Sequence, residues 1–401
     1  MLQVPAFGRQ TEYWVAETDG MTSRARLAEA SGEYQSTIPP RIAGWAPSVP
    51  AGLMADTEEA AAALGRFDSY ARGVLGDGSP SLGPMSSILL RTESTSSSQI
   101  ENLTVGARQL ALAEIDQSKS ENARTVVANV RAMEAALALA DRLDPDAVLE
   151  MHRALLSGQA GWEDHAGRWR DSLIWVGRSS VSPRGASHVA PQANLVPAAM
   201  DDLMEFIRRD DLPVVVQAAV AHAQFENIHP FSDGNGRTGR ALVHSMLRAK
   251  ALVTSTTAPV SAGLLKDTEH YFEALTAYRD GDARPIVEQF AAAARFAAHA
   301  GSDLVDQLSG QIDGARARMS GLRPQAAGWK VLPHLLSQPV ISTNYLTVNA
   351  GMGHQTAQNA LAQLVEAGVL EERTGLRRNR VWQHSGIIAV LDHFAQSLIR
   401  R

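Results

Sequence analysis

The chain has 401 residues, 45% of them hydrophobic, and a net charge of −6, which are values typical of a soluble globular protein with more than one core. It contains no cysteine, which excludes disulfides, thiolate zinc sites and cysteine nucleophiles. We see no secretory signal and no apolar run of about eighteen residues, so we expect a cytoplasmic protein without membrane contact. Any catalyst in this chain must therefore be a histidine, a carboxylate, a hydroxyl or a bound ion.

Helical periodicity dominates the chain after an N-terminal stretch of about 60 residues, which we expect to be extended and loop-rich. Two short runs, LIWVG at 173–177 and HVAP at 188–191, are typical of strands around a loop. The predicted fold class is therefore mainly α with a short β-hairpin. The expected helices cover residues 56–71, 84 onward, 122–141, 147–156, 196–208, 212–227, 237–250, 266–278 and 283–306.

The C-terminal part differs in charge from the rest of the chain. Residues 323–401 carry eight Lys or Arg against four Asp or Glu, so the rest of the chain is more acidic than the whole. A polar, glycine-containing stretch precedes this part and indicates a joint. We predict an N-terminal region at 1–105, a catalytic core at 106–306, a linker at 307–322 and a C-terminal domain at 323–401.

The C-terminal domain is predicted to be a winged helix-turn-helix, because three helical segments precede two strands around a basic turn. Such a domain can place polar side chains in a DNA groove and arginines on phosphates. A role in docking proteins stays open, because the positive charge is modest for a DNA binder. The candidate DNA contacts are His354, Gln355, Thr356, Gln358, Arg377, Arg378 and Arg380.

The segment AHAQFENIHPFSDGNGRTGR, at residues 221–240, carries the chemistry. Its first helix ends at IHP, because Pro230 cannot continue a helix and disfavours helical angles at His229. After a tight turn the next helix begins at about Arg237. The amides of Gly234, Asn235 and Gly236 then lie at a helix N-terminus, which predicts a phosphate-binding loop.

Charged residues around this loop fit the same interpretation. Arg237 and Arg240 share one face of the new helix and can both reach a polyphosphate. Asp233 would repel phosphate unless a divalent cation lay between them, as magnesium usually does. His229 titrates near neutral pH and suits a general base, whereas Phe231 points away as a core anchor.

Three other interpretations of the segment are possible. A helix-loop-helix corner explains a Gly-Asn-Gly turn, but not the fixed order of the His, Asp and two arginines. A P-loop fits poorly, because no Gly-Lys-Ser/Thr follows. A zinc site remains as an alternative, since His222, Glu226 and His229 recur at helical spacing, although their order is not HExxH.

The motif HPFSDGNGRTGR resembles the signature of the Fic family, HPFx(D/E)GNGRxxR, at every fixed position. The resemblance extends to GRWRDSLIWVG before HVAPQANLVPAAMDDL and to HYFEALTAYRDGD, and thus spans roughly residues 35–300. It implies a mostly helical Fic core with a hairpin flap. It also implies an enzyme that moves AMP from ATP onto a Ser, Thr or Tyr hydroxyl of a protein.

Carried over to this sequence, the resemblance makes His229 the base that accepts the proton of the target hydroxyl. Asp233 would hold magnesium. The phosphates of ATP would be bound by Gly234, Asn235, Gly236, Arg237 and Arg240. His188 and Val189 would belong to the flap that clamps the target, and they depart from the aromatic-Val-Pro sequence that is more frequent there. Tyr271 is either a neighbour of the adenine or a simple packing residue.

The run RTESTSSSQIENL, at residues 91–103, raises a separate question. Its hydroxyl residues are poor helix formers, so composition favours a solvated loop. The run nevertheless resembles the inhibitory motif (S/T)xxxE(G/N), which autoinhibited family members carry on a helix, with Ser97, Glu101 and Asn102 at its fixed positions. The resemblance implies that the Glu101 carboxylate pairs with Arg240 and takes the place of the γ-phosphate.

Our first hypothesis is a magnesium-dependent protein adenylyltransferase held inactive by Glu101. The second is a transcription regulator whose core senses nucleotide and whose winged helix binds DNA. Removal of AMP from a target is a third. The expected partner is a protein with a hydroxyl side chain, which can be the chain itself, and a homodimer stays open.

Overall fold

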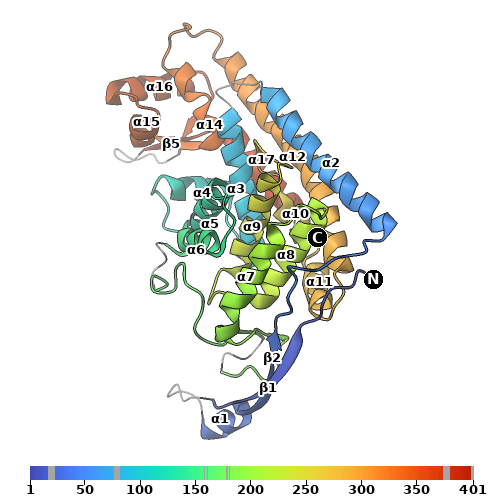
Figure 1. The fold of residues 1–401 in the computed structure, drawn as a ribbon. Coiled ribbons are helices and arrows are strands. Elements are labelled where there is room, and N and C mark those ends of the chain that lie inside the picture. The colour runs from blue at the N-terminus through green and yellow to red at the C-terminus, as the bar shows by residue number, and fades with distance from the viewer. Residues whose placement is uncertain are drawn as a thin grey trace. The chain divides into compact units, whose positions relative to one another are not determined.

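The computed structural model describes residues 1–16, 23–75, 82–157, 159, 161–177, 179, 181–373 and 380–398. The chain forms two compact units, each assembled from segments that are distant in sequence. The first contains residues 1–58, 135–250 and 269–291; the second contains 59–134, 251–268 and 292–401. Helices make up most of both units (Figure 1), which confirms the mainly α prediction.

The first unit holds the 221–240 segment. It contains β1 (Gly8–Trp14), α1 (Arg24–Ala30), β2 (Gly32–Ile38), α6 (Pro145–Leu156), β3 (Trp175–Val176), β4 (His188–Val189), the 3-10 turn η1 (Ala193–Leu195), α7 (Val196–Ile207), α8 (Val214–Ile228), α9 (Asn235–Ala249) and α11 (Thr268–Arg279). Three longer helices contribute residues to both units: α2 (Ala51–Leu75), α5 (Glu121–Ala138) and α12 (Arg284–Arg318).

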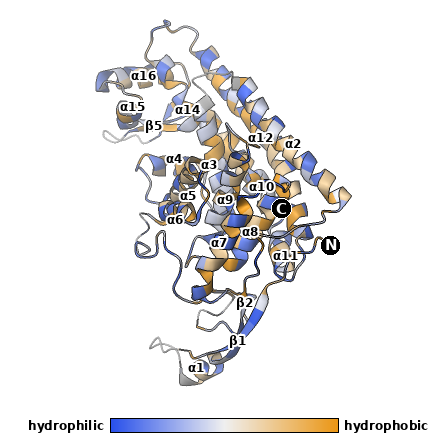
Figure 2. Ribbon diagram, viewed as in Figure 1, coloured by the Kyte–Doolittle hydropathy of each residue, from blue (hydrophilic) through white to orange (hydrophobic). Residues whose placement is uncertain are grey.

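Helix α8 is the centre of the first unit. It is buried at every position from Val215 to Ile228 except Glu226, and it packs against both α7 and α9 (Figures 1 and 2). A helix that is apolar almost all round has no face left for water and must lie inside the protein. The HPFSDGNGRTGR motif therefore begins at the end of a buried helix.

The N-terminal residues are more ordered than we predicted. In place of an extended, loop-rich entry, β1 and β2 form an antiparallel hairpin with Gly8 opposite Ile38 and Trp14 opposite Gly32. The side chains of β1 are mostly exposed, so the strand lacks the alternation of apolar and polar residues by which a strand is recognised in a sequence. The predicted flap strands are present as β3 and β4, which pair antiparallel.

The second unit contains the serine-rich helix and the C-terminal elements. These are α3 (Leu82–Ile100), α4 (Ala107–Glu114), α10 (Val260–Leu265), α13 (Gly328–Val331), α14 (His334–Ser337), β5 (Val340–Ser342), α15 (Thr343–Asn349), α16 (His354–Glu366), β6 (Glu371–Glu372), β7 (Val381–Gln383) and α17 (Ser385–Leu398). The strands form one sheet in the order β5-β7-β6. The succession is compatible with a winged helix, which stays a prediction.

The serine run is helical, so the loop favoured by its composition is wrong. Ser94, Ser97 and Ser98 are fully buried, and helix α3 contacts α10 and α14. Hydroxyl groups on α3 donate to the carbonyl four residues earlier, as in Thr92 to Ile88 (2.8 Å) and Ser98 to Ser94 (2.9 Å). Satisfied in this way, the hydroxyls no longer compete for backbone groups outside the helix.

The predicted linker at 307–322 is largely absent, because α12 continues without interruption to Arg318. The buried residues Leu304, Leu308, Ile312 and Ala315 follow helical spacing and outweigh the glycines that suggested a joint. The domain boundary at 323 differs from the structure as well. Val340, Val381 and Ile388 share one hydrophobic cluster with Ala111 and Leu112 of α4, a helix inside the predicted catalytic core at 106–306.

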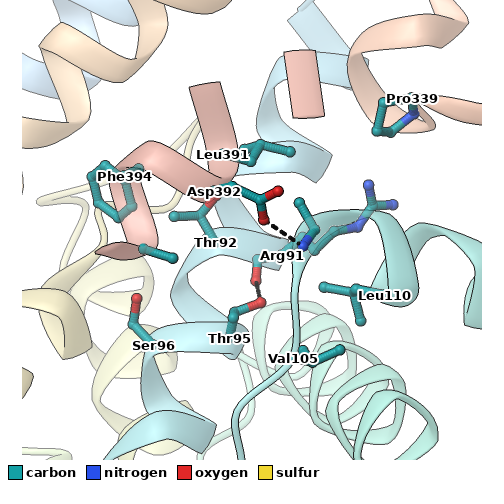
Figure 3. Close-up of a pocket in the computed structure, with 12 residues that line it drawn as sticks. Arg91, Thr92, Thr95, Ser96, Val105, Leu110, Pro339, Leu391, Asp392 and Phe394 are labelled. Atoms are coloured by element: carbon teal, nitrogen blue, oxygen red, sulfur yellow. Dashed lines mark hydrogen bonds between the residues drawn. The ribbon is translucent and has the colours of Figure 1, made fainter. Parts of the chain in front are cut away.

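A small cavity of about 30 Å³ lies within the second unit between α3, the 105–110 segment and α17. Figure 3 shows Thr92, Thr95, Leu391 and Phe394 around it. On its border the Asp392 carboxylate accepts a hydrogen bond from the Ala107 amide at 2.8 Å. Helices α3 and α17 thus line one cavity, and the hydrogen bond on its border joins α17 to the start of α4.

Candidate active site

His229 occupies a backbone conformation that the sequence around it dictates. Its φ of 52° and ψ of 62° are left-handed, and its N–H donates to the Phe225 carbonyl at 2.9 Å to close the end of α8. A helix commonly ends in this way, although glycine is the usual residue at such an angle. Pro230 prevents continuation of the helix. The chain therefore leaves α8 sharply at the candidate base.

The imidazole of His229 is held in one tautomer. Its Nδ1 lies 3.2 Å from the carbonyl oxygen of Glu226. A carbonyl only accepts hydrogen bonds, so Nδ1 carries the proton in the neutral ring and Nε2 carries the lone pair. The half-buried ring is thus arranged so that Nε2 can accept a proton from a substrate hydroxyl.

The glycine loop after His229 forms the predicted N-terminal turn of α9. Gly234 is the cap, with a φ of 75°, and helix α9 begins at Asn235, slightly before the predicted start. A Cβ at Gly234 would come within 2.6 Å of Leu155 Cδ2, so close packing as well as φ requires glycine there. The first amides of α9 and the helix dipole can stabilise an anion at this point.

The side chain of Asn235 is bonded to the backbone of Phe231. Its Oδ1 accepts from the Phe231 amide at 2.8 Å, and its Nδ2 donates to the Phe231 carbonyl at 2.8 Å. The side chain is 3% exposed. Asn235 therefore braces the loop, and any contribution to phosphate binding would come from its backbone N–H.

Charges gather at the start of α9. Arg237 and Arg240 are each 3% exposed, and Arg237 Nη2 lies 3.0 Å from the Asp233 carboxylate. The Asp233 side chain is 39% exposed, and a single accessible carboxylate next to a phosphate-binding turn is a donor set that suits magnesium. The accessible carboxylate of Asp233 is compatible with the predicted magnesium ion, which stays a prediction.

His152 and Phe231 support the loop, and no sequence pattern points to His152. The two rings stack at 3.6 Å between centroids, and Phe231 is fully buried as a core anchor. His152 Nδ1 accepts from the Gly167 amide at 3.0 Å, and its Nε2 lies 3.1 Å from the Asp233 carbonyl. Burial lowers the pKa of His152 to about 4, so the ring is neutral and fixes the position of Asp233.

Tyr271 is packed inside the first unit, and its predicted place beside an adenine stays a prediction. It is 1% exposed, and its hydroxyl lies 2.7 Å from Nε2 of the buried His222. Burial, with the nearby charge of Arg240, lowers the pKa of His222 to about 3. The next residue, Phe272, is 53% exposed and lines the pocket that contains His229. Sequence periodicity alone could not distinguish the two positions.

That pocket has a volume of about 700 Å³ and is formed by the flap, the end of α8 and α11. On the flap, His188 Nε2 lies 3.1 Å from the Asn227 carbonyl, and the Val189 carbonyl accepts from the Thr37 hydroxyl at 3.0 Å. Burial lowers the pKa of His188 to about 3. His188 thus fastens the β3–β4 hairpin to α8, while the pocket leaves open space beside His229.

The remaining candidates are placed as follows. In the described part of the chain no group of three or more His, Asp or Glu could hold a metal ion, so the zinc alternative with His222, Glu226 and His229 gains no support. Gln355 and Thr356 are exposed in the first turn of α16. Arg377 and Arg378 lie outside the described residues.

Ser97 is buried in α3, and Glu101 lies in the turn directly after that helix. Asn102 follows with a φ of 62°, and the Leu103 amide donates to the Ser98 carbonyl at 3.0 Å. Such an end requires a residue that tolerates left-handed angles, which explains physically why Gly or Asn follows the glutamate in this motif.

No helix that the structure describes is both long and apolar enough to cross a membrane.

Comparison with known proteins gives a consistent result. Residues 142–247 match the sequence model of the Fic/DOC family, and residues 54–138 match that of the Fic/DOC family N-terminal region. Protein adenylyltransferase fic-1 of Caenorhabditis elegans is 30% identical over 154 residues, 38% of this chain and 27% of that protein. Protein adenylyltransferase Fic of Nematostella vectensis is 29% identical over 145 residues, 35% of this chain and 30% of that protein.

A crystal structure of a Fic family protein from Desulfovibrio desulfuricans superimposes with a TM-score of 0.51. The two sequences are 23% identical, and the match covers 84% of this chain and 97% of the other protein. At this level of identity the similarity shows the fold alone. This chain spans less than a third of the length of the two adenylyltransferases. The motif, the two family matches and the shared fold agree, and over residues 54–247 the chain belongs to the Fic/DOC family.

Proposed function

We propose that the protein is an adenylyltransferase that moves AMP from ATP onto a hydroxyl side chain of a protein. The observation that carries this proposal is the single loop that joins a histidine of fixed tautomer to a helix N-terminus suited to phosphate. The names of the two relatives support the same reaction. A base beside a phosphate site is the minimum that a nucleotidyl transfer needs.

In the proposed reaction, His229 Nε2 accepts the proton of the target hydroxyl as its oxygen attacks the α-phosphorus of ATP. A new oxygen–phosphorus bond forms, the bond between the α- and β-phosphates breaks, and pyrophosphate leaves. The amides of Gly234 and Gly236, with Arg237 and Arg240, bind the phosphates. Asp233 would hold magnesium, which neutralises phosphate charge when bound.

The target would be held by the flap. Strands β3 and β4 form a pair of only two residues each, and Val176 on β3 is 48% exposed. Such an edge can accept an extended segment by backbone pairing, which brings a hydroxyl into the pocket beside His229. The identity of the side chain as Ser, Thr or Tyr is part of this proposal.

We further propose that Glu101 keeps the enzyme inactive by pairing with Arg240 in place of the γ-phosphate. The position of Glu101 at the fixed end of α3 supports a defined role for its carboxylate. Release would require movement of α3, whose hydroxyl residues are buried against α10 and α14. A change that loosens this packing would thus raise activity.

A second candidate function is DNA binding through the C-terminal elements. The observation in its favour is the polar, exposed face at the start of α16, with Gln355, Thr356 and Gln358. Arg380 is less available than we expected, because it pairs with Glu372 and lies 4.9 Å from the Trp382 ring centre. Sequence-specific binding of DNA together with an inert core would favour this candidate.

The test uses ATP labelled at either the α- or the γ-phosphate, incubated with magnesium and the Glu101→Gly protein. We expect label from the α-position in protein, and a mass gain of one AMP. The matched control is Glu101→Gly combined with His229→Ala, which should remain unlabelled. Label from the γ-position alone would identify a kinase, and no label with any protein substrate would reject the transferase.

A further inference from the structure

Arg170 is a buried arginine whose partners are unusual. It belongs to the segment GRWR that precedes the flap, and it is 4% exposed. Buried arginines normally pair with carboxylates. Within the described residues, the hydrogen bonds of this guanidinium end on backbone carbonyls instead. Burial lowers the pKa of Arg170 to about 10, so it remains a cation at neutral pH.

The four carbonyls come from two places that matter for the proposed reaction. Nη1 donates to Ser172 at 2.7 Å and Nη2 to Pro191 at 2.6 Å, and these residues flank the flap on either side. Nε donates to His229 at 2.8 Å, and Nη2 is also 3.5 Å from Ile228. One rigid, planar group thus connects both legs of the flap with the backbone of the candidate base.

The backbone of Arg170 adds to this connection. Its N–H donates to the Pro230 carbonyl at 3.0 Å, so the two successive carbonyls after α8 are both bonded to Arg170. His229 has the left-handed φ of 52°, which is unfavourable for a residue with a side chain and needs support from its surroundings. Arg170 supplies this support at the carbonyl, while Glu226 orients the ring through Nδ1.

We propose that Arg170 is a positioning residue that fixes the distance between the target-clamping flap and His229. This inference rests on the proposed transfer reaction, because it assigns the flap to the target and His229 to the proton. A target segment paired with β3 or β4 would be held by a frame that Arg170 shares with the base. Displacement of the flap would then move the carbonyl of His229, and displacement of this carbonyl would move the flap.

The same bonds could serve folding alone, and the two roles predict different results. A purely structural residue changes how much protein is folded, which scales the rate without changing the KM for the target. A positioning residue changes both kcat and the KM for the target, and leaves ATP binding unaltered. An error of about 1 Å in such a geometry can cost about 100-fold in rate.

The experiment compares Arg170→Met and Arg170→Lys in the Glu101→Gly background. We expect Arg170→Met to lower kcat about 10- to 100-fold and to raise the KM for the target, with the Kd for ATP unchanged. Arg170→Lys keeps the charge but cannot donate to all three carbonyls, so its kcat and its KM for the target should lie between those of Arg170→Met and of the chain with Arg170. It also carries the test if Arg170→Met fails to fold.

Arg209→Met is the matched control. Arg209 also donates to backbone carbonyls, those of Ala43 and Trp45, in addition to its pair with the Asp211 carboxylate, and all of these lie outside the flap and the motif. It should keep kcat and both substrate constants per folded molecule. If the Arg170 variants behave like Arg209→Met, Arg170 only stabilises the fold and the proposal is overturned.

A second readout separates this proposal from the proposed function. Hydrogen exchange should become faster at the flap amides of Ser187 and Ala190 in Arg170→Met, and the ¹⁵N signals of His229 should show a mixture of tautomers. Both can be measured without substrate. If the Glu101→Gly chain transfers no AMP but Arg170→Met shows these changes, the reaction is refuted and the coupling is retained, whereas unchanged exchange and tautomer in Arg170→Met would refute the coupling.

Discussion

Gly234 is the residue in the phosphate-binding turn where an alanine should have the largest and most informative effect. Its φ of 75° costs a residue with a Cβ about 1–2 kcal/mol. The new Cβ would lie 2.6 Å from Leu155 Cδ2 in a fully buried environment, which adds the cost of overpacking, about 1–3 kcal/mol. Gly234→Ala should therefore destabilise the first unit by about 2–5 kcal/mol.

The two causes can be separated with Leu155→Ala. That substitution removes the atom that the new Cβ meets, at its own cost of about 2–5 kcal/mol. In its background, Gly234→Ala should cost only the backbone part, about 1–2 kcal/mol. The double-mutant cycle is measured by urea unfolding, with hydrogen exchange of the α9 amides to report on the first unit.

Binding of ATP provides the functional half of this test. Backbone strain moves the amides of α9, so Gly234→Ala should lower the affinity for ATP even when Leu155→Ala has removed the clash. Equal costs of Gly234→Ala with and without Leu155 would refute the packing argument. Unchanged ATP affinity in the double variant would show that the turn is not the phosphate site.

Three more predictions concern the base, the inhibitory motif and pH. His229→Ala should lower AMP transfer about 100- to 10,000-fold with ATP affinity retained by calorimetry; a loss below tenfold would exclude it as the base. Glu101→Gly should raise the transfer rate only while Arg240 is present, so that activation in an Arg240→Ala background would show the motif to be misassigned. The free energy of unfolding should fall as pH drops below about 6.5, by up to about 1.4 kcal/mol per pH unit for each buried imidazole. The reason is that the unfolded chain binds protons in this range, whereas folded His152 and His222, with pKa values of about 4 and 3, do not. In His222→Asn, the free energy of unfolding measured with urea should depend less steeply on pH. An unchanged pH dependence would show that His222 is not buried as a neutral imidazole.

Much of the catalytic loop could be predicted from the sequence because its geometry is set by near neighbours. Pro230 ends α8, Gly234 supplies a left-handed turn, and the amides of α9 follow within three residues. Each of these steps depends on backbone sterics and on bonds between residues at most four apart. The positions of most helices follow for the same reason, since apolar spacing is a local property.

The serine run shows where local reasoning fails. Hydroxyl residues disfavour an isolated helix, but in α3 they are buried and bonded to preceding carbonyls. The packing of α3 against α10 and α14 contributes more than the intrinsic preference of Ser and Thr. The family motif predicted the helix correctly because it is taken from proteins in which this segment is already packed as a helix.

The sequence by itself therefore determined the sharp end of α8 at His229, the left-handed turn at Gly234 and the mainly helical fold. Only the tertiary structure decided that Tyr271 is buried, that Phe272 faces the pocket, and that Arg170 and His152 hold the motif. Arg170 and His229 are 59 positions apart, and His152 and Asp233 are 81 apart. No spacing rule joins residues at such separations, because what brings them together is the burial of α8 and the need of its terminal carbonyls for donors.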